Sequence, residues 1–253
     1  MLKRLLKYVA PKAFLDGLER CNTAGLRSIA PRSIVSMLDV GCGDGTLTIR
    51  FAEAAGAAEV HGIEFVDTLR ATAEEKGIVC TAQDLNAPWD IPADSFDLIV
   101  SSQNIEHLHN TRLYLEECMR CLAPGGQLVV LTENLASWVN IGALVFGWQP
   151  FSTTNINGWS LGNPLIWHEG EPRDESFIGR WQSTGVSGTV GHVRVLSYRG
   201  MADILKKTGF TGVRVRTKGY LPLWGWISDL MCAIDRLHGH FIIATGFKPL
   251  DSV

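Results

Sequence analysis

The chain has 253 residues, of which 46% are hydrophobic and 19% are charged, and its formal net charge is −3. This length and composition are sufficient for one large α/β domain or two small ones. The nearly balanced charge argues against bulk binding of nucleic acid through its phosphates. The sequence contains no run of about 18 apolar residues, so we expect no membrane-spanning helix.

The first segment, residues 1–30, is expected to be helical and separate from the main domain. It begins MLKRLLKYVAPKAFL, which is basic and amphipathic. Because Lys7 and Pro11 interrupt a signal-peptide core, we expect a cytoplasmic protein. The helix either packs on the domain and covers its ligand, or rests on a membrane surface and makes a weak peripheral contact.

Residues 31–253 are expected to form one domain that alternates strands and helices. Apolar runs predict buried strands at 34–40, 58–64, 77–82, 96–102 and 126–132, with helices at 46–55, 67–76 and 111–122. This order predicts a parallel, doubly wound sheet. The sequence Pro124-Gly125-Gly126 predicts a turn before the fifth strand. A final helix, strand, helix and strand at 198–208, 212–217, 228–237 and 240–246 predict an antiparallel hairpin at the sheet edge.

Two other features depart from this pattern. Residues 134–191 are irregular and rich in Gly, Asn, Ser and Trp, which predicts an ordered insertion that caps a substrate site. Six cysteines are scattered through the chain, as in reduced cytosolic proteins. Cys118 and Cys121 form a Cys-x-x-Cys pair in a predicted helix, for which core packing is favoured over a redox or metal role.

A glycine-rich turn is the main functional motif. The sequence Leu38-Asp39-Val40-Gly41-Cys42-Gly43-Asp44-Gly45 ends a predicted strand and precedes a helix, an arrangement that binds nucleotide-like cofactors. Dinucleotide sites place a third glycine three positions after the second, where this chain has Thr46. The carboxylate of Asp39 disfavours a diphosphate and favours a cofactor that carries an ammonium and a sulfonium.

These residues resemble motif I of the class I S-adenosylmethionine-dependent methyltransferases. Four further segments resemble later motifs of the family in the same order, namely 60–65, 82–85, 96–108 and 122–128. Asp44 departs from the family, in which Thr or Ser is common. The resemblance implies a Rossmann-like, seven-stranded, mostly parallel sheet with an antiparallel edge hairpin. It also implies helices on both faces and an insertion after strand five.

The resemblance assigns cofactor roles near the methionine end of S-adenosylmethionine. Gly41, Gly43 and Gly45 form the turn beside the methionine. Asp39 favours the ammonium, directly or through water. Ser101 to Gln103, at the end of the fourth strand, face the same end of the cofactor.

The adenosine end is assigned to the second and third strands. Glu64 is expected to accept hydrogen bonds from the ribose hydroxyls, the alternative being a solvated strand end. Phe65 covers the adenine face or is a core residue. Asp84 accepts a hydrogen bond from the adenine N6 amine, and the backbone N–H of Leu85 faces a ring nitrogen.

Three histidines are candidates for the base that removes a proton from a hydroxyl nucleophile. His107 follows the fourth strand, His192 follows the insertion, and His168 lies within the insertion. We expect no metal, because the sequence places no third ligand beside His107 and His109.

The favoured function is methylation of a small-molecule, sugar or glycolipid hydroxyl, with S-adenosylhomocysteine as product. The resemblance is to methyltransferases of polysaccharide and secondary-metabolite pathways. Two alternatives remain: a non-catalytic module that binds the cofactor, and a nicotinamide-dependent oxidoreductase, which Thr46 disfavours. The sequence leaves the acceptor, the methylated atom and the oligomeric state open.

Overall fold

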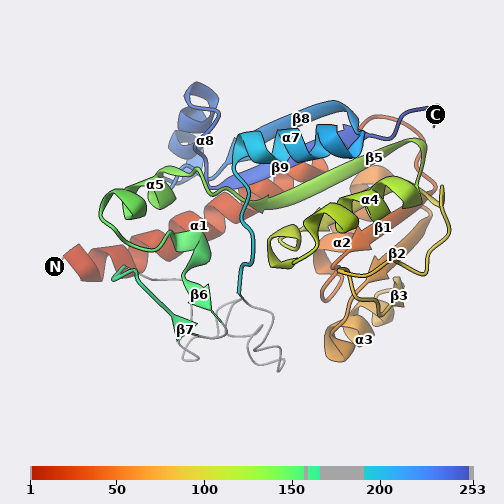
Figure 1. Cartoon of the computed structure of the whole chain (residues 1–253), viewed down its shortest axis with the longest axis horizontal. Coiled ribbons are helices and arrows are strands. Elements are labelled where there is room, and N and C mark those ends of the chain that lie inside the picture. Colours follow the sequence, from red (N-terminus) through yellow and green to blue (C-terminus); the bar gives the residue numbers. More distant parts are fainter. Residues whose placement is uncertain (1, 157–158, 166–190, 251–253) are drawn as a thin grey trace.

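The computed structural model describes residues 2–156, 159–165 and 191–250 (Figure 1). Its centre is a seven-stranded sheet in the order β3-β2-β1-β4-β5-β9-β8. The strands are β1 Ser36–Val40, β2 Glu59–Ile63, β3 Val79–Thr81, β4 Phe96–Ser102, β5 Leu122–Glu133, β8 Thr211–Lys218 and β9 Phe241–Phe247. β1 to β5 pair in parallel, whereas β9 is antiparallel to both β5 and β8. The predicted fold class, including its antiparallel edge hairpin, is confirmed.

Helices cover both faces of the sheet. They are α1 Leu2–Leu26, α2 Thr46–Ala55, α3 Asp67–Glu75, α4 Thr111–Cys121, α5 Trp138–Val145, α7 Tyr198–Thr208 and α8 Gly225–Ile234. One core cluster contains Tyr114 of α4 and Leu205 of α7, which Figure 1 shows on one face. The cluster on the other face contains Cys21 of α1 and Phe51 of α2. The sheet therefore owes its burial to both helical layers, and α1 contributes to the second. The proposed boundary at residue 30 stays a prediction.

The region after β5 contains short elements. They are α5, the 3₁₀ turn η2 at Phe151–Thr153, and the two-residue strands β6 Asn155–Ile156 and β7 Trp159–Ser160. A further 3₁₀ turn, η1 at Ile105–His107, follows β4. The expected role of 134–191 as a substrate cap stays a prediction, because residues 166–190 lie outside the described part of the chain.

Two local predictions are refined by the structure. The Pro-Gly-Gly sequence lies inside β5 rather than before it: Leu122 already pairs with Phe96, and the register shifts before Leu98 meets Gln127. Gly125 absorbs the irregularity with φ +74°. Cys118 and Cys121 are both fully buried in α4, and burial raises the pKa of the Cys121 thiol to about 11. The core-packing interpretation of this pair is the one that the burial supports.

The carboxyl ends of the parallel strands define one edge of the sheet. β5 ends there at Glu133, which pairs with Phe241 at the start of β9. α5 follows β5 and α8 precedes β9, so both helices lie at this edge. Within the described residues, no helix has the length and apolar character needed to cross a membrane. Ligands of open α/β sheets bind outside this edge.

Candidate active site

The glycine turn has the backbone geometry that the sequence predicts. Gly41, Gly43 and Gly45 have φ of +81°, +56° and +77°, in the left-handed region that residues with a Cβ rarely adopt. A Cβ added to Gly45 would lie 2.5 Å from Cδ1 of Ile78, whereas one added to Gly43 would meet nothing within 4 Å. Gly45 is therefore required for packing, and Gly43 borders open space in which a ligand can approach the backbone.

Replacing these two glycines by alanine should have separable effects. We expect Gly45→Ala to lower the melting temperature by about 5 °C or more, because it combines left-handed strain with a steric clash. Gly43→Ala adds only the strain, so its melting temperature should fall by about 2–4 °C. Its affinity for S-adenosylhomocysteine should nevertheless fall, since its methyl group enters the open space. Thermal unfolding and calorimetric titration measure both effects. Equal melting temperatures for the two variants would contradict this account of the turn.

Asp39 is a buried carboxylate with one oxygen available for a ligand. It is 4% exposed, and its Oδ2 accepts a hydrogen bond of 2.6 Å from the hydroxyl of Thr48. Oδ1 has no hydrogen-bond partner among the described residues. Burial raises the pKa of Asp39 to about 7, the Thr48 hydroxyl opposes the shift, and the charge of Glu64 adds to it. A bound cation would satisfy the unpaired oxygen, and this fits the ammonium assigned to Asp39.

Glu64 is held rigidly at the end of β2. Its two oxygens accept backbone hydrogen bonds, Oε2 from Gly43 at 2.9 Å and Oε1 from Val66 at 2.8 Å. At 8% exposure it is not a solvated strand end. The neighbouring Phe65 is 71% exposed and is therefore not a core residue. The assignment of Glu64 to the ribose and of Phe65 to the adenine stays a prediction.

The third-strand residues lie close to the surface. Asp84 is exposed, and its Oδ1 accepts hydrogen bonds from the backbone and the side chain of Asn86. Leu85 is partly buried against the core cluster of the α4 face. Neither placement conflicts with an adenine contact.

At the end of β4 the structure distinguishes Ser101 from Gln103. The buried hydroxyl of Ser101 donates to the carbonyl oxygen of Val40 at 2.8 Å and so joins β4 to the end of β1. Gln103 has φ +51°, and its buried Nε2 has no hydrogen-bond partner among the described residues. Asn104, which the sequence analysis did not single out, lies against the turn: a Cβ on Gly41 would come within 2.8 Å of its Cγ. An unpaired donor and the unpaired acceptor of Asp39 suit the zwitterionic end of S-adenosylmethionine.

Two of the three candidate histidines are brought together. The rings of His107 and His192 lie 4.8 Å apart, edge to face. The backbone explains this contact, because the N–H groups of Val193 and Arg194 both donate to the carbonyl oxygen of Glu106. The third candidate, His168, lies outside the described residues.

Backbone carbonyl oxygens lie within hydrogen-bond distance of both rings. Nδ1 of His192 lies 2.6 Å from the carbonyl oxygen of Ser152, and Nδ1 of His107 lies 3.3 Å from that of Gly191. Because a carbonyl only accepts, Nδ1 of each ring carries the proton in these contacts. The basic lone pair of each neutral ring is then on Nε2.

Buried carboxylates surround the histidine pair. Glu106 is fully buried, its Oε2 accepts from the Thr132 hydroxyl at 2.8 Å, and burial raises its pKa to about 7. Oε2 of Glu133 lies 3.8 Å from Nδ1 of His192 and 3.6 Å from Nε2 of His240. The sequence analysis missed these carboxylates and His240, although Glu106 directly precedes His107. The signal that was present is a Glu-His pair following the fourth strand.

The same cluster has the donor set of a metal site. Ligand atoms of Glu106, His107 and His192 lie within 4.8 Å of one another. No metal was expected from sequence because no third ligand was found beside His107 and His109, and the fold brings Glu106 and His192 to His107.

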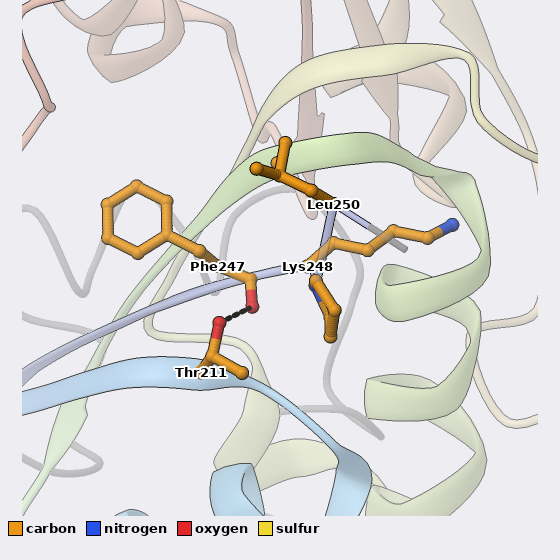
Figure 2. A pocket seen from close by; sticks show the side chains of 6 residues that line it. Thr211, Phe247, Lys248 and Leu250 are labelled. Atoms are coloured by element: carbon orange, nitrogen blue, oxygen red, sulfur yellow. Dashed lines mark hydrogen bonds between the residues drawn. The ribbon is translucent and has the colours of Figure 1, made fainter. Parts of the chain in front are cut away.

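One hollow on the molecule lies away from this cluster. It is an open depression of about 580 Å³ at the opposite end of β9. Figure 2 shows its lining side chains, among which the hydroxyl of Thr211 donates to the carbonyl oxygen of Phe247. Nζ of Lys248 is bonded to Asp94 and to the carbonyl oxygen of Leu122. The one charged side chain that lines the depression, Lys248, is thus already hydrogen-bonded within the protein. We therefore assign the depression no role in catalysis.

Comparison with protein families adds the decisive observation. A family model described as "Methyltransferase domain" matches residues 2–215, which is most of the chain. The chain belongs to this methyltransferase family. Both the expected enzyme class and the cofactor, S-adenosylmethionine, are confirmed at this level, and the nicotinamide alternative is set aside.

Curated relatives of this methyltransferase carry one recurring name. Ubiquinone biosynthesis O-methyltransferase of Parvibaculum lavamentivorans is 31% identical over 140 residues, covering 50% of this chain and 53% of the relative. The protein of that name from Cereibacter sphaeroides is 32% identical over 204 residues, covering 76% and 68%. The mitochondrial rat protein is 30% identical over 131 residues, covering 47% and 36%. The chain thus spans between a third and about half of the length of several of these relatives.

Solved structures share the methyltransferase fold. An S-adenosylmethionine-dependent methyltransferase from Mesorhizobium loti has a TM-score of 0.57 at 22% identity, covering 90% of this chain and 97% of that one. A Thermotoga maritima methyltransferase described as a possible histamine N-methyltransferase has a TM-score of 0.55 at 16% identity, covering 95% and 91%. These similarities concern the fold alone.

Proposed function

We propose that this methyltransferase transfers a methyl group to a hydroxyl of a small-molecule acceptor. The observation that carries the proposal is the pair of imidazoles, His107 and His192, next to buried carboxylates at the carboxyl edge of the sheet. A hydroxyl nucleophile must lose its proton, and histidine is the side chain best suited to accept one near neutral pH. The cofactor supplies an activated methyl group on a sulfonium.

The chain's own residues align and deprotonate the acceptor in this proposal. Asn104 joins the two halves of the site, since it contacts the glycine turn and lies three positions before His107. His192 accepts the hydroxyl proton at Nε2 while its Nδ1 remains bonded to the Ser152 carbonyl oxygen. The nearby carboxylate of Glu133 stabilises the imidazolium that forms. Alignment of the oxygen behind the methyl group supplies much of the remaining rate enhancement.

The names of the relatives favour an aromatic hydroxyl over a sugar hydroxyl. Ubiquinone, which those names mention, has a quinone ring, and a phenolic hydroxyl has a pKa of about 10. A histidine can deprotonate a phenol more readily than the less acidic hydroxyl of a sugar. The sugar or glycolipid acceptor predicted from the Trp- and Asn-rich insertion remains the second candidate.

An acceptor panel tests the proposal. We expect methyl transfer to a simple catechol such as 3,4-dihydroxybenzoate to exceed transfer to a methyl glycoside or a primary amine, with one S-adenosylhomocysteine released per methyl ether. Mass spectrometry identifies the methylated atom. Cofactor binding without turnover on any acceptor would favour the non-catalytic module instead. Turnover that chelators abolish and added divalent cations restore would assign the Glu106 cluster to a metal ion rather than to a base.

A further inference from the structure

Helix α8 presents large apolar side chains outward and buries the small side chains of Ser228 and Cys232. Trp226, Leu230 and Ile234 are 73%, 49% and 71% exposed, and their spacing of four places them along one stripe of the helix. On the inner side, the buried hydroxyl oxygen of Ser228 accepts a hydrogen bond of 2.7 Å from the backbone of Tyr220. Surface helices of water-soluble domains show the reverse arrangement. The outer face of α8 therefore lacks a partner among the described residues.

A second apolar group adjoins this stripe. Nε1 of Trp138, the first residue of α5, donates to Oδ2 of Asp235, which directly follows α8. The ring of Trp138 also lies 4.5 Å from that of His238. α5 and α8, together with the flanking residues Phe146 and Trp224, hold most of the large apolar side chains that are exposed in the described residues. These are Trp138, Leu144, Val145, Phe146, Trp224, Trp226, Ile227, Leu230 and Ile234, called here the α5–α8 surface.

Positive charge borders the α5–α8 surface. Nζ of the exposed Lys12 lies 5.4 Å above the ring of Trp224. The first fifteen residues carry four cationic side chains and no acidic one, in a chain whose net charge is −3. The acidic groups beneath α8 are paired internally: Arg20 contacts both Asp16 and Asp229. The cation of Lys12 at the border of the surface complements an anionic partner.

The α5–α8 surface lies at the functional edge of the molecule. Figure 1 shows α5 and α8 at the end where α1 begins, far from the C-terminus. β5 leads into α5 directly after Glu133, which contacts the histidine pair. A partner seated on this surface would therefore border the proposed acceptor site.

We infer that the α5–α8 surface docks on a lipid bilayer that contains anionic headgroups. Exposed tryptophans and aliphatic side chains on short helices insert at the interface between headgroups and acyl chains, and neighbouring cations are attracted to anionic lipid. α8 is only about 15 Å long, which is too short to cross the roughly 30 Å hydrocarbon core of a bilayer and suits a helix that lies at its interface. The sequence predicted a weak membrane contact through the N-terminal helix alone, and the inference adds α5 and α8 to that contact. The inference does not depend on the proposed acceptor.

Vesicle co-sedimentation tests the inference with the full chain. The probes are vesicles of pure phosphatidylcholine and vesicles containing phosphatidylglycerol as the anionic lipid. We expect binding to the anionic vesicles, weakened by salt. The double variant Trp226→Gln/Ile234→Gln should lower their partition coefficient about tenfold or more, because two large apolar anchors are lost. Lys12→Gln should lower it about fivefold for anionic vesicles and leave binding to neutral vesicles unchanged.

Leu250→Gln is the matched control. Leu250 is 78% exposed and follows β9 by three residues, close to the C-terminus, which Figure 1 marks far from α5 and α8; its replacement should therefore leave vesicle binding unchanged. Because all these side chains are exposed, the variants should melt at the wild-type temperature. Absence of binding by the wild-type chain would overturn the inference. So would concentration-dependent dimerisation that only the double variant abolishes, since the surface would then bind a second copy. Loss of catechol methylation with vesicle binding intact would concern the proposed function alone.

Discussion

Replacement of His192 by alanine is expected to lower kcat for hydroxyl methylation by about 10²–10⁴-fold. The reason is the loss of the imidazole that accepts the hydroxyl proton. Affinity for S-adenosylhomocysteine should stay near the wild-type value, because the glycine turn, Asp39 and Glu64 are untouched. Steady-state kinetics and calorimetric titration measure the two quantities separately.

The neighbouring histidine provides the control for this experiment. His107→Ala should reduce kcat less than His192→Ala, since the carboxylate of Glu133 lies 3.8 Å from the ring of His192. Added imidazole should restore part of the activity of His192→Ala, a response that a merely structural role does not produce. Unchanged kcat in both variants would exclude a histidine base at this position. A larger loss in His107→Ala with imidazole rescue would reverse the two assignments.

Asp39→Asn is expected to weaken cofactor binding and to stabilise the ligand-free protein. The folded-state pKa of Asp39 is raised from its ordinary value of 3.8 to about 7 by burial. A raised carboxyl pKa contributes stability below about pH 4, and that contribution is lost as the pH rises through about 7. At pH 8 the wild-type chain therefore carries the cost of a buried charge that asparagine does not impose. The melting temperature of the ligand-free variant should be higher than that of the wild type at pH 8.

Asp39→Asn should weaken cofactor binding although it raises the melting temperature of the ligand-free protein. The ammonium of S-adenosylhomocysteine stabilises the ionised form of Asp39, so affinity should increase between about pH 6 and pH 8 in the wild type. Asp39→Asn should lose about tenfold in affinity or more at pH 8 and show a flatter pH dependence. Thr48→Val serves as a comparison, because it removes the hydroxyl bonded to Oδ2 and keeps the charge. If Asp39→Asn binds S-adenosylhomocysteine as tightly as the wild type at pH 8, the role assigned to Asp39 is wrong.

The sheet and its glycine turn were predictable from sequence because local patterns encode them. Apolar runs separated by helical segments specify parallel strands, and the spacing of Gly41, Gly43 and Gly45 specifies a turn with positive φ. The boundaries of β5 were not predictable in the same way. Leu122 joins the strand through pairing with Phe96, a tertiary contact that overrides the Pro-Gly-Gly turn signal.

The composition of the histidine cluster was only partly predictable. His107 was predicted from the motif that follows β4. His192 was predicted from its position directly after the insertion, where the chain returns to the main domain. The hydrogen bonds from Val193 and Arg194 to Glu106 that bring them together connect segments far apart in sequence. The buried Glu133 ends β5 and the buried His240 directly precedes β9, and the antiparallel register that brings them together is specified by no local pattern. The outward position of Leu230 and Ile234 on α8 was not predicted, since their spacing is also that of a core helix.

The bond between His192 and the carbonyl oxygen of Ser152 joins two residues 40 positions apart in the chain. The bond joins the two ends of the segment that runs from η2 to His192. Closing a chain segment between fixed ends becomes only about 0.6 kcal/mol more costly when its length doubles. By this measure, a change in the length of the segment costs little stability. Acceptor preference can diverge within such a lineage while the machinery that holds the cofactor is inherited unchanged.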